Sequence, residues 1–205
     1  VGKDSLLDNS TGSGNTAVGV ESLANNTTAS ENVAVGKLAM YVNTTGAGNT
    51  ALGYTTMRFN TTGTSNVIVG AAALYNATTG SWNTAIGFEA GRSVTTGGNN
   101  VFVGRKAGYY TTSLTSGNTS TFLGSYAHPT TTTPGSCVVI GHAVGGGDAY
   151  TTIGHGSADI RASHGTATWA AVSDERYKKD IVDSTAGLSL VNALQPRTFK
   201  YKNKG

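Results

Sequence analysis

The chain has 205 residues with only 12% charged side chains, a formal net charge of +3, 29 glycines, 32 threonines and 3 prolines. Soluble domains average about 25% charged residues and about 7% glycine, so this composition argues against an ordinary globular enzyme. Collagen is excluded because glycine does not recur at every third position, and the low net charge argues against a disordered chain.

Membrane insertion and disulfide bonding are also excluded by simple counts. No apolar run approaches the roughly 20 residues that cross a bilayer, and the start of the sequence has no signal-peptide pattern. The single cysteine, Cys137, cannot form an internal disulfide. The net positive charge comes from a short tail of mixed sign after residue 156, with no basic stripe, so we expect no nucleic-acid partner.

A phrase of the type Asn-x-x-aliphatic-Gly recurs from the start of the chain. Six copies follow one another with a constant period of seventeen, and three degenerate copies follow, which predicts nine stacked units: Asn15–Gly19, Asn32–Gly36, Asn49–Gly53, Asn66–Gly70, Asn83–Gly87, Asn100–Gly104, Thr121–Gly124, Val138–Gly141 and Thr151–Gly154. Each unit is expected to be a short strand closed by glycine, followed by a Thr-Thr turn. Repeated short units of this kind predict a parallel β-solenoid or β-roll, and a rod of about 40 to 45 Å.

Both faces of each predicted strand are apolar or small. The first residue after Asn is β-branched and the third is aliphatic, as in Thr16 and Val18, so we expect this face to be buried. The middle residue, such as Ala17 or Phe102, points to the opposite face and is also small or apolar. A strand that is apolar on both sides is buried on both sides. We therefore expect one face to line the solenoid and the other to pack on copies of the chain, most simply as a homotrimer.

A second rhythm has a period of two units. The ninth residue after each Asn alternates between aromatic and cationic side chains over Tyr41, Arg58, Tyr75, Arg92 and Tyr109. This alternation predicts a stacked cation–π ladder along the outside of the fibre, or simply alternating bulk between neighbouring units. It also leaves open that one turn of the structure contains two repeats, or 34 residues, instead of one.

The ends of the sequence indicate two domains within a longer protein. Val1-Gly2 lies one full period before Val18-Gly19, so the chain is expected to begin inside a unit. We predict a repeat domain over residues 1–156, truncated at its N-terminus, and a second domain over residues 157–205. In the second we expect a short helix over 187–194, with Leu188, Val191 and Leu194 on one face, and a strand after Pro196. The predicted fold is thus an all-β trimeric solenoid with a small α/β segment.

The segment Ser173-Asp-Glu-Arg-Tyr-Lys-Lys-Asp-Ile181, followed by a Leu-rich helix and a Pro-x-x-Phe strand, resembles the start of the intramolecular chaperone of endosialidase tailspikes and phage tail fibres. The resemblance implies a domain that trimerises the fibre and then cuts itself off. Its serine nucleophile and lysine base match Ser173 and Lys178, with the scissile bond between Ser173 and Asp174. A buried lysine can act as base, and the alternative role of Ser173 is a helix N-cap. Since the sequence stops at Gly205, far short of a whole domain of this kind, we expect this truncated chain to stay uncut.

The repeats also resemble the β-roll heads of trimeric autotransporter adhesins, over residues 15–154. Both resemblances imply trimeric surface fibres, and the chaperone-like tail favours the viral one.

Other candidate sites are weaker. His142 and His155 each follow the glycine of a unit and are expected to stack on adjacent turns, and we expect no metal or cofactor. Asn-x-Thr sequons at Asn26, Asn43, Asn60 and Asn76 are better explained by turn chemistry. Glu21 and Glu89, four units apart, lie about 19 Å from each other, too far for the carboxylate pair of a glycosidase within one chain. Lys106 is expected to pair with Glu89 on the surface.

The sequence therefore predicts a structural and receptor-binding segment of a trimeric phage tail fibre. Its partners would be two further copies and a host cell-surface glycan or protein, and its place the virion after synthesis in the host cytoplasm. The inserts at Tyr109–Thr119, His128–Ser136 and Ala143–Ala149 are the expected recognition loops. The alternatives are a bacterial adhesin head or a glycan-depolymerising tailspike.

Overall fold

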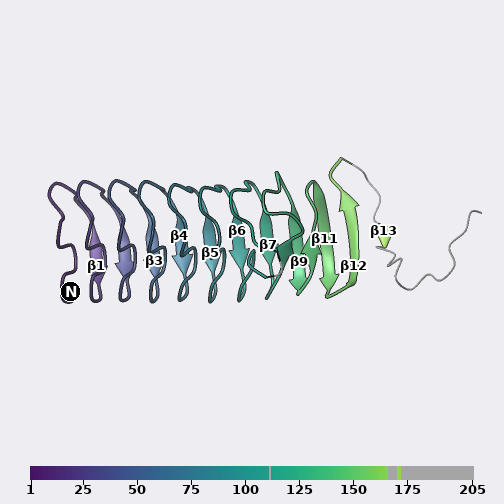
Figure 1. The fold of residues 1–205 in the computed structure, drawn as a ribbon, viewed down its shortest axis with the longest axis horizontal. Helices are drawn as coiled ribbons and strands as arrows, with labels where there is room; N and C mark the ends of the chain where they lie inside the picture. Colours follow the sequence, from purple (N-terminus) through teal and green to yellow (C-terminus); the bar gives the residue numbers. More distant parts are fainter. Residues whose placement is uncertain (111, 166–169, 172–205) are drawn as a thin grey trace, which may run out of the picture. The chain divides into compact units, whose positions relative to one another are not determined.

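The computed structural model describes residues 1–110, 112–165 and 170–171. Short strands stack side by side along one axis (Figure 1). After each strand a loop brings the chain back to the side of the sheet where the next strand begins. Nine of them are parallel and follow chain order: β1 (Thr16–Val18), β2 (Val33–Val35), β3 (Thr50–Leu52), β4 (Val67–Val69), β5 (Thr84–Ile86), β6 (Val101–Val103), β7 (Thr121–Leu123), β9 (Val138–His142) and β11 (Tyr150–His155).

The register shows that each turn of the solenoid, hereafter a rung, is one copy of the ~17-residue repeat. Ala17 lies opposite Ala34 and Ala34 opposite Ala51 across the first strand pairs, and the same spacing persists through the pairing of β5 with β6. The insertion before β7 lengthens one rung without changing the register, because Phe102 still pairs with Phe122. The predicted nine-rung parallel solenoid is confirmed, with one repeat per turn and not two.

The middle residue of each strand lines the interior. Ala34, Ile68 and Phe102 are fully buried, whereas the residues that flank them in the strand are half-buried or exposed. The first and third residues, which we expected to be buried, thus form the outer face of the single chain, and the middle residue lines its interior. The first and third residues point outward, because the loop of each rung folds over the opposite side of its strand and covers the middle residue.

The loops keep their shape through left-handed backbone at fixed places in the repeat. One set of such residues recurs at equivalent positions: Glu21 (φ 56°), Leu38 (59°), Thr55 (51°), Ala72 (53°), Glu89 (55°), Lys106 (56°) and Tyr126 (60°). A non-glycine residue in this conformation costs about 1 to 2 kcal/mol, so the stacking of each rung on the next must offset this cost. Glycine is required at the strand end, because at Gly70 (φ +140°) a Cβ would lie 2.3 Å from the carbonyl oxygen of Gly87.

Two columns of buried asparagines run through the solenoid. In the first, the phrase asparagines bond rung to rung: Asn66 Nδ2 donates to Asn49 Oδ1 at 2.9 Å, and Asn66 Oδ1 accepts from the backbone N–H of Asn83 at 2.9 Å. The second column joins Asn9, Asn26, Asn43 and Asn60. It ends where the next rung has Ala77, which leaves Asn60 Oδ1 without a partner.

The size of the interior side chains varies from rung to rung. The rungs with Ala34 and Ala51 at the strand centre also bury Met40 and Met57 in the core. At the wider Phe102 ring, the facing positions are Gly91 and Gly108, where a Cβ would come within 2.9 Å and 2.4 Å of ring carbons. Phe102 then stacks on Phe122, with centroids 5.5 Å apart and an interplanar angle of 2°.

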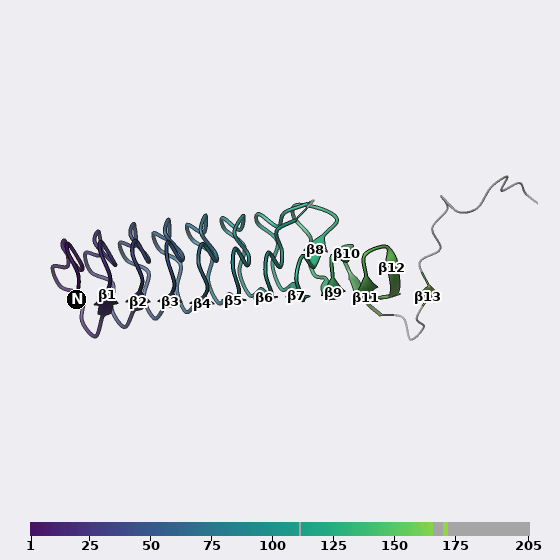
Figure 2. The same ribbon diagram turned by 90° about the horizontal axis from the view of Figure 1, so that it is seen from below.

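The late rungs are less regular. The inserts form a second small sheet of β8 (His128–Pro129) and β10 (Gly145–Gly146), which lies apart from the row of the other strands (Figure 2). β12 (Ala158–Ser163) then pairs antiparallel with β11, and β13 (Ala170–Ala171) pairs antiparallel with β12.

The chain divides into two units, Val1–Val172 and Ser173–Gly205. The predicted domain boundary after residue 156 stays a prediction, and the helix over 187–194 and the strand after Pro196 lie outside the described residues. Within the described part of the chain, no helix has the length and apolar character needed to cross a membrane.

Candidate interaction surfaces

The outward face of the parallel sheet is uncharged along its whole length. We call it the strand face: the first and third residues of the nine rungs, which are Thr16, Val18, Val33, Val35, Thr50, Leu52, Val67, Val69, Thr84, Ile86, Val101, Val103, Thr121, Leu123, Val138, Ile140, Thr151 and Ile153. Every member is Thr, Val, Leu or Ile. Several expose a large fraction of their surface, such as Val18 at 41% and Ile86 at 42%. An uncharged strip of this length that stays exposed in a single chain is a candidate interaction surface.

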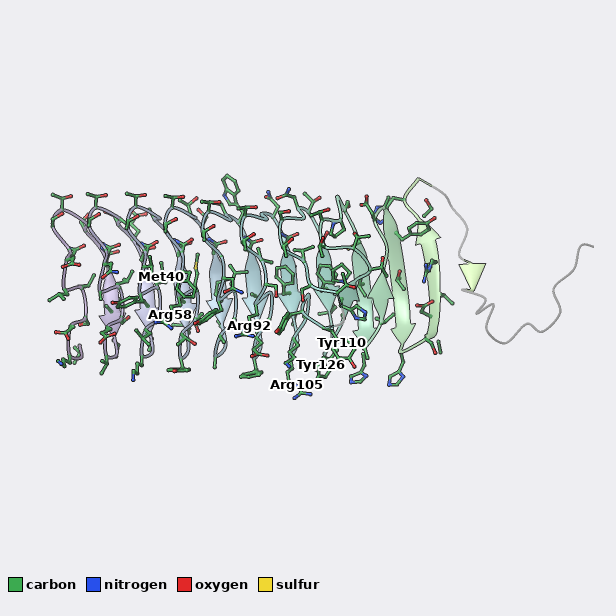
Figure 3. The ribbon with its side chains drawn as sticks, in the orientation of Figure 1. Met40, Arg58, Arg92, Arg105, Tyr110 and Tyr126 are labelled. Carbon is green, nitrogen blue, oxygen red and sulfur yellow. The ribbon has the colours of Figure 1, made fainter. Side chains whose placement is uncertain are left out.

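The predicted ladder of tyrosines and arginines is present, and its members are half-buried. The Arg58 guanidinium lies 5.8 Å from the Tyr41 ring centroid, and that of Arg92 lies 5.4 Å from Tyr75 and 5.6 Å from Tyr109. Arg58 Nη1 also donates to the Tyr75 hydroxyl at 3.2 Å, and Arg92 Nη1 to the Tyr109 hydroxyl at 3.2 Å. Figure 3 shows Arg58 and Arg92 on the same side of the solenoid. The ladder stabilises the stack of rungs.

Glu89 is neutralised by cations of its own and the next rung. Its carboxylate lies 3.4 Å from Lys106 Nζ and 3.7 Å from Arg92 Nε, and its side chain is 16% exposed. The predicted pairing of Glu89 with Lys106 is confirmed.

A cluster of aromatic rings lies beyond the regular repeats. Tyr110 packs on Tyr126 with centroids 4.7 Å apart, and Tyr126 on His142 at 6.0 Å. The predicted stacking of His142 on His155 is confirmed, with centroids 5.1 Å apart and an interplanar angle of 19°. No group of three or more His, Cys, Asp or Glu side chains able to hold a metal occurs among the described residues.

This cluster, with Arg105 beside it, was missed by sequence reasoning apart from its histidine pair. Tyr110 lies in an insert and Tyr126 follows one, so the alignment of the repeats does not relate them. The signal that could have found the cluster is the run of aromatic residues shortly after the glycines of the last rungs.

Two other polar groups have local structural roles. Asp148 Oδ1 accepts from the backbone N–H groups of Ser136 and Gly135, each at 2.9 Å. Both bonds lower the pKa of the Asp148 carboxyl below its ordinary value, and the bond from Ser136 has the larger effect. Burial raises the pKa of the Cys137 thiol, which is enclosed by the solenoid.

The sequons Asn26, Asn43 and Asn60 are fully buried in the second asparagine column, which confirms that structure and not glycosylation explains them. Asn76 is half-buried outside that column. The predicted cleavage residues Ser173 and Lys178 lie outside the described residues.

Comparison with known families identifies the tail. Residues 173–205 match the Peptidase S74 family, described as the chaperone of endosialidase. The chain thus carries a segment of this chaperone after a β-solenoid, as the motif at Ser173 predicted. Such a segment is typical of proteins of the phage tail fibre and tailspike type. No curated protein and no solved structure matches the chain.

Proposed function

We infer that this chain, which carries a Peptidase S74 segment after a β-solenoid, is a structural and receptor-binding segment of a homotrimeric phage tail fibre. The observation that supports this function best is the strand face, which is uncharged over nine rungs and open to solvent in the single chain. Parallel sheets are normally covered on both faces. The solenoid's own loops cover one face, and copies of the chain are the simplest cover for the other.

The energetic gain favours such an assembly. Fully burying a Val, Leu or Ile side chain contributes about 1.5 to 3 kcal/mol. Strand-face residues such as Val69 (36% exposed) and Ile86 (42%) still expose over a third of their surface, so covering each contributes roughly 1 kcal/mol. Copies of one chain also share the same rung spacing, so their strand faces match along the full length.

The test is the oligomeric state of the full gene product with charges placed on the strand face. We expect Val69→Glu combined with Ile86→Glu to prevent trimer formation in analytical ultracentrifugation, because assembly would then bury carboxylates of like charge at the interface. The matched control is Thr62→Glu with Thr79→Glu, which adds the same charges one rung apart at exposed turn positions. A wild-type protein that stays monomeric, or a strand-face variant that trimerises as well as the control, would contradict the proposal.

We also propose that the tail is removed by its own Ser173 and Lys178. The neutral Lys178 amine acts as base toward the Ser173 hydroxyl, and the net reaction adds one water across the bond between Ser173 and Asp174. The bond breaks to leave a carboxylate on Ser173 and an amine on Asp174. The intact denatured mass of the full gene product should end at Ser173, and Ser173→Ala and Lys178→Ala should each leave the uncut mass. An uncut wild-type product would reduce Ser173 to a helix start.

The receptor role is supported by the position of the inserts, since insertions in solenoids map to loops that often bind partners. A host cell-surface glycan or protein is the proposed partner and the virion the proposed location. The purified fibre should compete with phage for adsorption to host cells. Failure to compete at saturating concentration would argue against a receptor-binding role and leave a purely structural one.

A further inference from the structure

A continuous row of aromatic rings, with one arginine, extends over the last rungs on one edge of the solenoid. We call it the aromatic track; its members are Arg105, Tyr110, Tyr126, His128, His142 and His155. Consecutive ring centroids are 4.7 Å apart from Tyr110 to Tyr126, 6.0 Å from Tyr126 to His142 and 5.1 Å from His142 to His155. His128 joins from the side, with its centroid 5.4 Å from that of Tyr110. Figure 3 shows Arg105, Tyr110 and Tyr126 close together at this edge.

The track is open to solvent. Tyr110 is 49% exposed, His142, His155 and Arg105 are exposed, and Tyr126 is half-buried. An interior role is therefore excluded for these rings, unlike Phe102 and Phe122. Contiguous exposed aromatic surface is uncommon on a soluble chain and marks a binding surface.

Arg105 supplies the track with an uncommitted positive charge. Its guanidinium carbon lies 4.6 Å from the Tyr126 ring centroid, and the guanidinium also contacts the Tyr126 hydroxyl. Within the described residues Arg105 makes no ion pair, whereas its neighbour Lys106 is paired with Glu89. Arg105 can thus donate hydrogen bonds to a ligand that lies against the Tyr126 ring.

The track begins where the regular repeat ends. The left-handed position that holds Tyr126 is occupied by Glu89 and Lys106 in the two preceding rungs, where those side chains pair with each other. Tyr110 belongs to the first insert and His128 opens the second. The change from an ion pair to aromatic rings therefore coincides with the change from uniform rungs to loops.

We propose that the aromatic track binds a chain of pyranose sugars, with Arg105 donating to a hydroxyl or acidic group of one residue. The C–H groups on a pyranose face carry partial positive charge and stack on the negative face of an aromatic ring. The rings are tilted or perpendicular at successive steps from Tyr110 to His142, so the track offers faces and edges in turn. This suits a ligand that has both C–H faces and hydroxyl groups.

A single-stranded nucleic acid fits less well. Such ligands need a groove with several cations that follow the phosphate backbone. The track has a single Arg and no Lys among its members, and within the described residues Arg105 makes no ion pair. The inference rests on the proposed receptor-binding function and deepens it by naming the site and the ligand class.

The experiment uses the full gene product and an array of purified bacterial surface polysaccharides, followed by a binding isotherm on the strongest signal. Tyr110→Ala with Tyr126→Ala should weaken binding at least tenfold. The matched control is Tyr54→Ala with Phe88→Ala, which removes two exposed aromatic rings (57% and 48%) from the regular rungs and should change affinity less than twofold. Arg105→Gln retains all the rings and should weaken binding without changing the thermal melting profile.

Three outcomes would overturn the inference: no polysaccharide on the array binds, the track variant binds as tightly as the control, or an oligo(dT) probe binds in a track-dependent way while polysaccharides do not. Ultracentrifugation and adsorption competition are measured on the same variants. If the track variant trimerises and still competes with phage as well as wild type, the receptor function stands and this site falls. If wild type neither trimerises nor competes, the proposed function fails instead.

Discussion

Removing one asparagine from the phrase column tests how far that column stabilises the stack of rungs. Asn66 is fully buried in the middle of the column. Its Nδ2 donates to Asn49 Oδ1 at 2.9 Å and to the Gly80 carbonyl at 3.0 Å. Its Oδ1 accepts from the Asn83 backbone N–H at 2.9 Å and from Asn83 Nδ2 at 3.2 Å. Asn66→Ala therefore removes four hydrogen bonds.

The expected loss is dominated by the groups left without a partner. Asn49 Oδ1 keeps the bond from the Asn66 backbone N–H, and Asn83 Nδ2 keeps its bond to Gly97. The Gly80 carbonyl and the Asn83 N–H lose the side-chain bonds described above. A buried polar group left unpaired costs about 1 to 3 kcal/mol. We therefore expect Asn66→Ala to lower the free energy of unfolding by about 4 kcal/mol per chain.

The assay is chemical denaturation together with hydrogen exchange at the Asn83 amide, which should exchange much faster in the variant. Asn76→Ala is the control, since Asn76 lies outside both columns and the change should cost within about 0.5 kcal/mol. Asn66→Ser should fall between them, because rung seven has Ser120 at this position and its hydroxyl still accepts from the Cys137 N–H. If Asn66→Ala costs no more than Asn76→Ala, the column does not hold the rungs together.

Three further outcomes are expected. Gly108→Ala should lower the free energy of unfolding by about 2 to 4 kcal/mol, from left-handed backbone and overpacking, because the φ of Gly108 is +73° and the added Cβ would lie 2.4 Å from the Phe102 ring. Adding Phe102→Leu to the same chain should restore part of this stability in chemical denaturation. If it restores none, the proposed clash is refuted. The Cys137 thiol should react with a thiol reagent only after unfolding, since burial both encloses it and raises its pKa; labelling of the native protein would contradict this. Because the pKa of Asp148 is lowered on folding, its stabilisation is present above the ordinary aspartate pKa of about 3.9 and is lost as pH falls below it. Exchange of the two amides bonded to its carboxylate should therefore accelerate in acid, and a pH profile identical to that of Asp148→Asn would show that the carboxylate has no such role.

The candidate surfaces were predictable where they depend on the repeat. The alternation of Tyr41, Arg58 and Tyr75 places side chains on adjacent rungs, so the ladder follows once one repeat makes one turn. The same reasoning predicted the pair of His142 and His155. This reasoning does not predict the contact between Tyr110 and Tyr126, because the inserts break the alignment of the repeats. The contact of the two rings depends on how the loops fold.

The sequence by itself determined the period, the nine strands and their parallel register, because identical short units bury their apolar groups best when each stacks on the next. Only the tertiary structure decided which side of each strand is inside. Ala34 and Val35 are both small or apolar, so neither burial preference nor the two-residue alternation distinguishes their faces. The left-handed residues of the loop, such as Leu38 and Glu89, set the direction in which the chain curls, and this curl encloses Ala34 and leaves Val35 on the strand face.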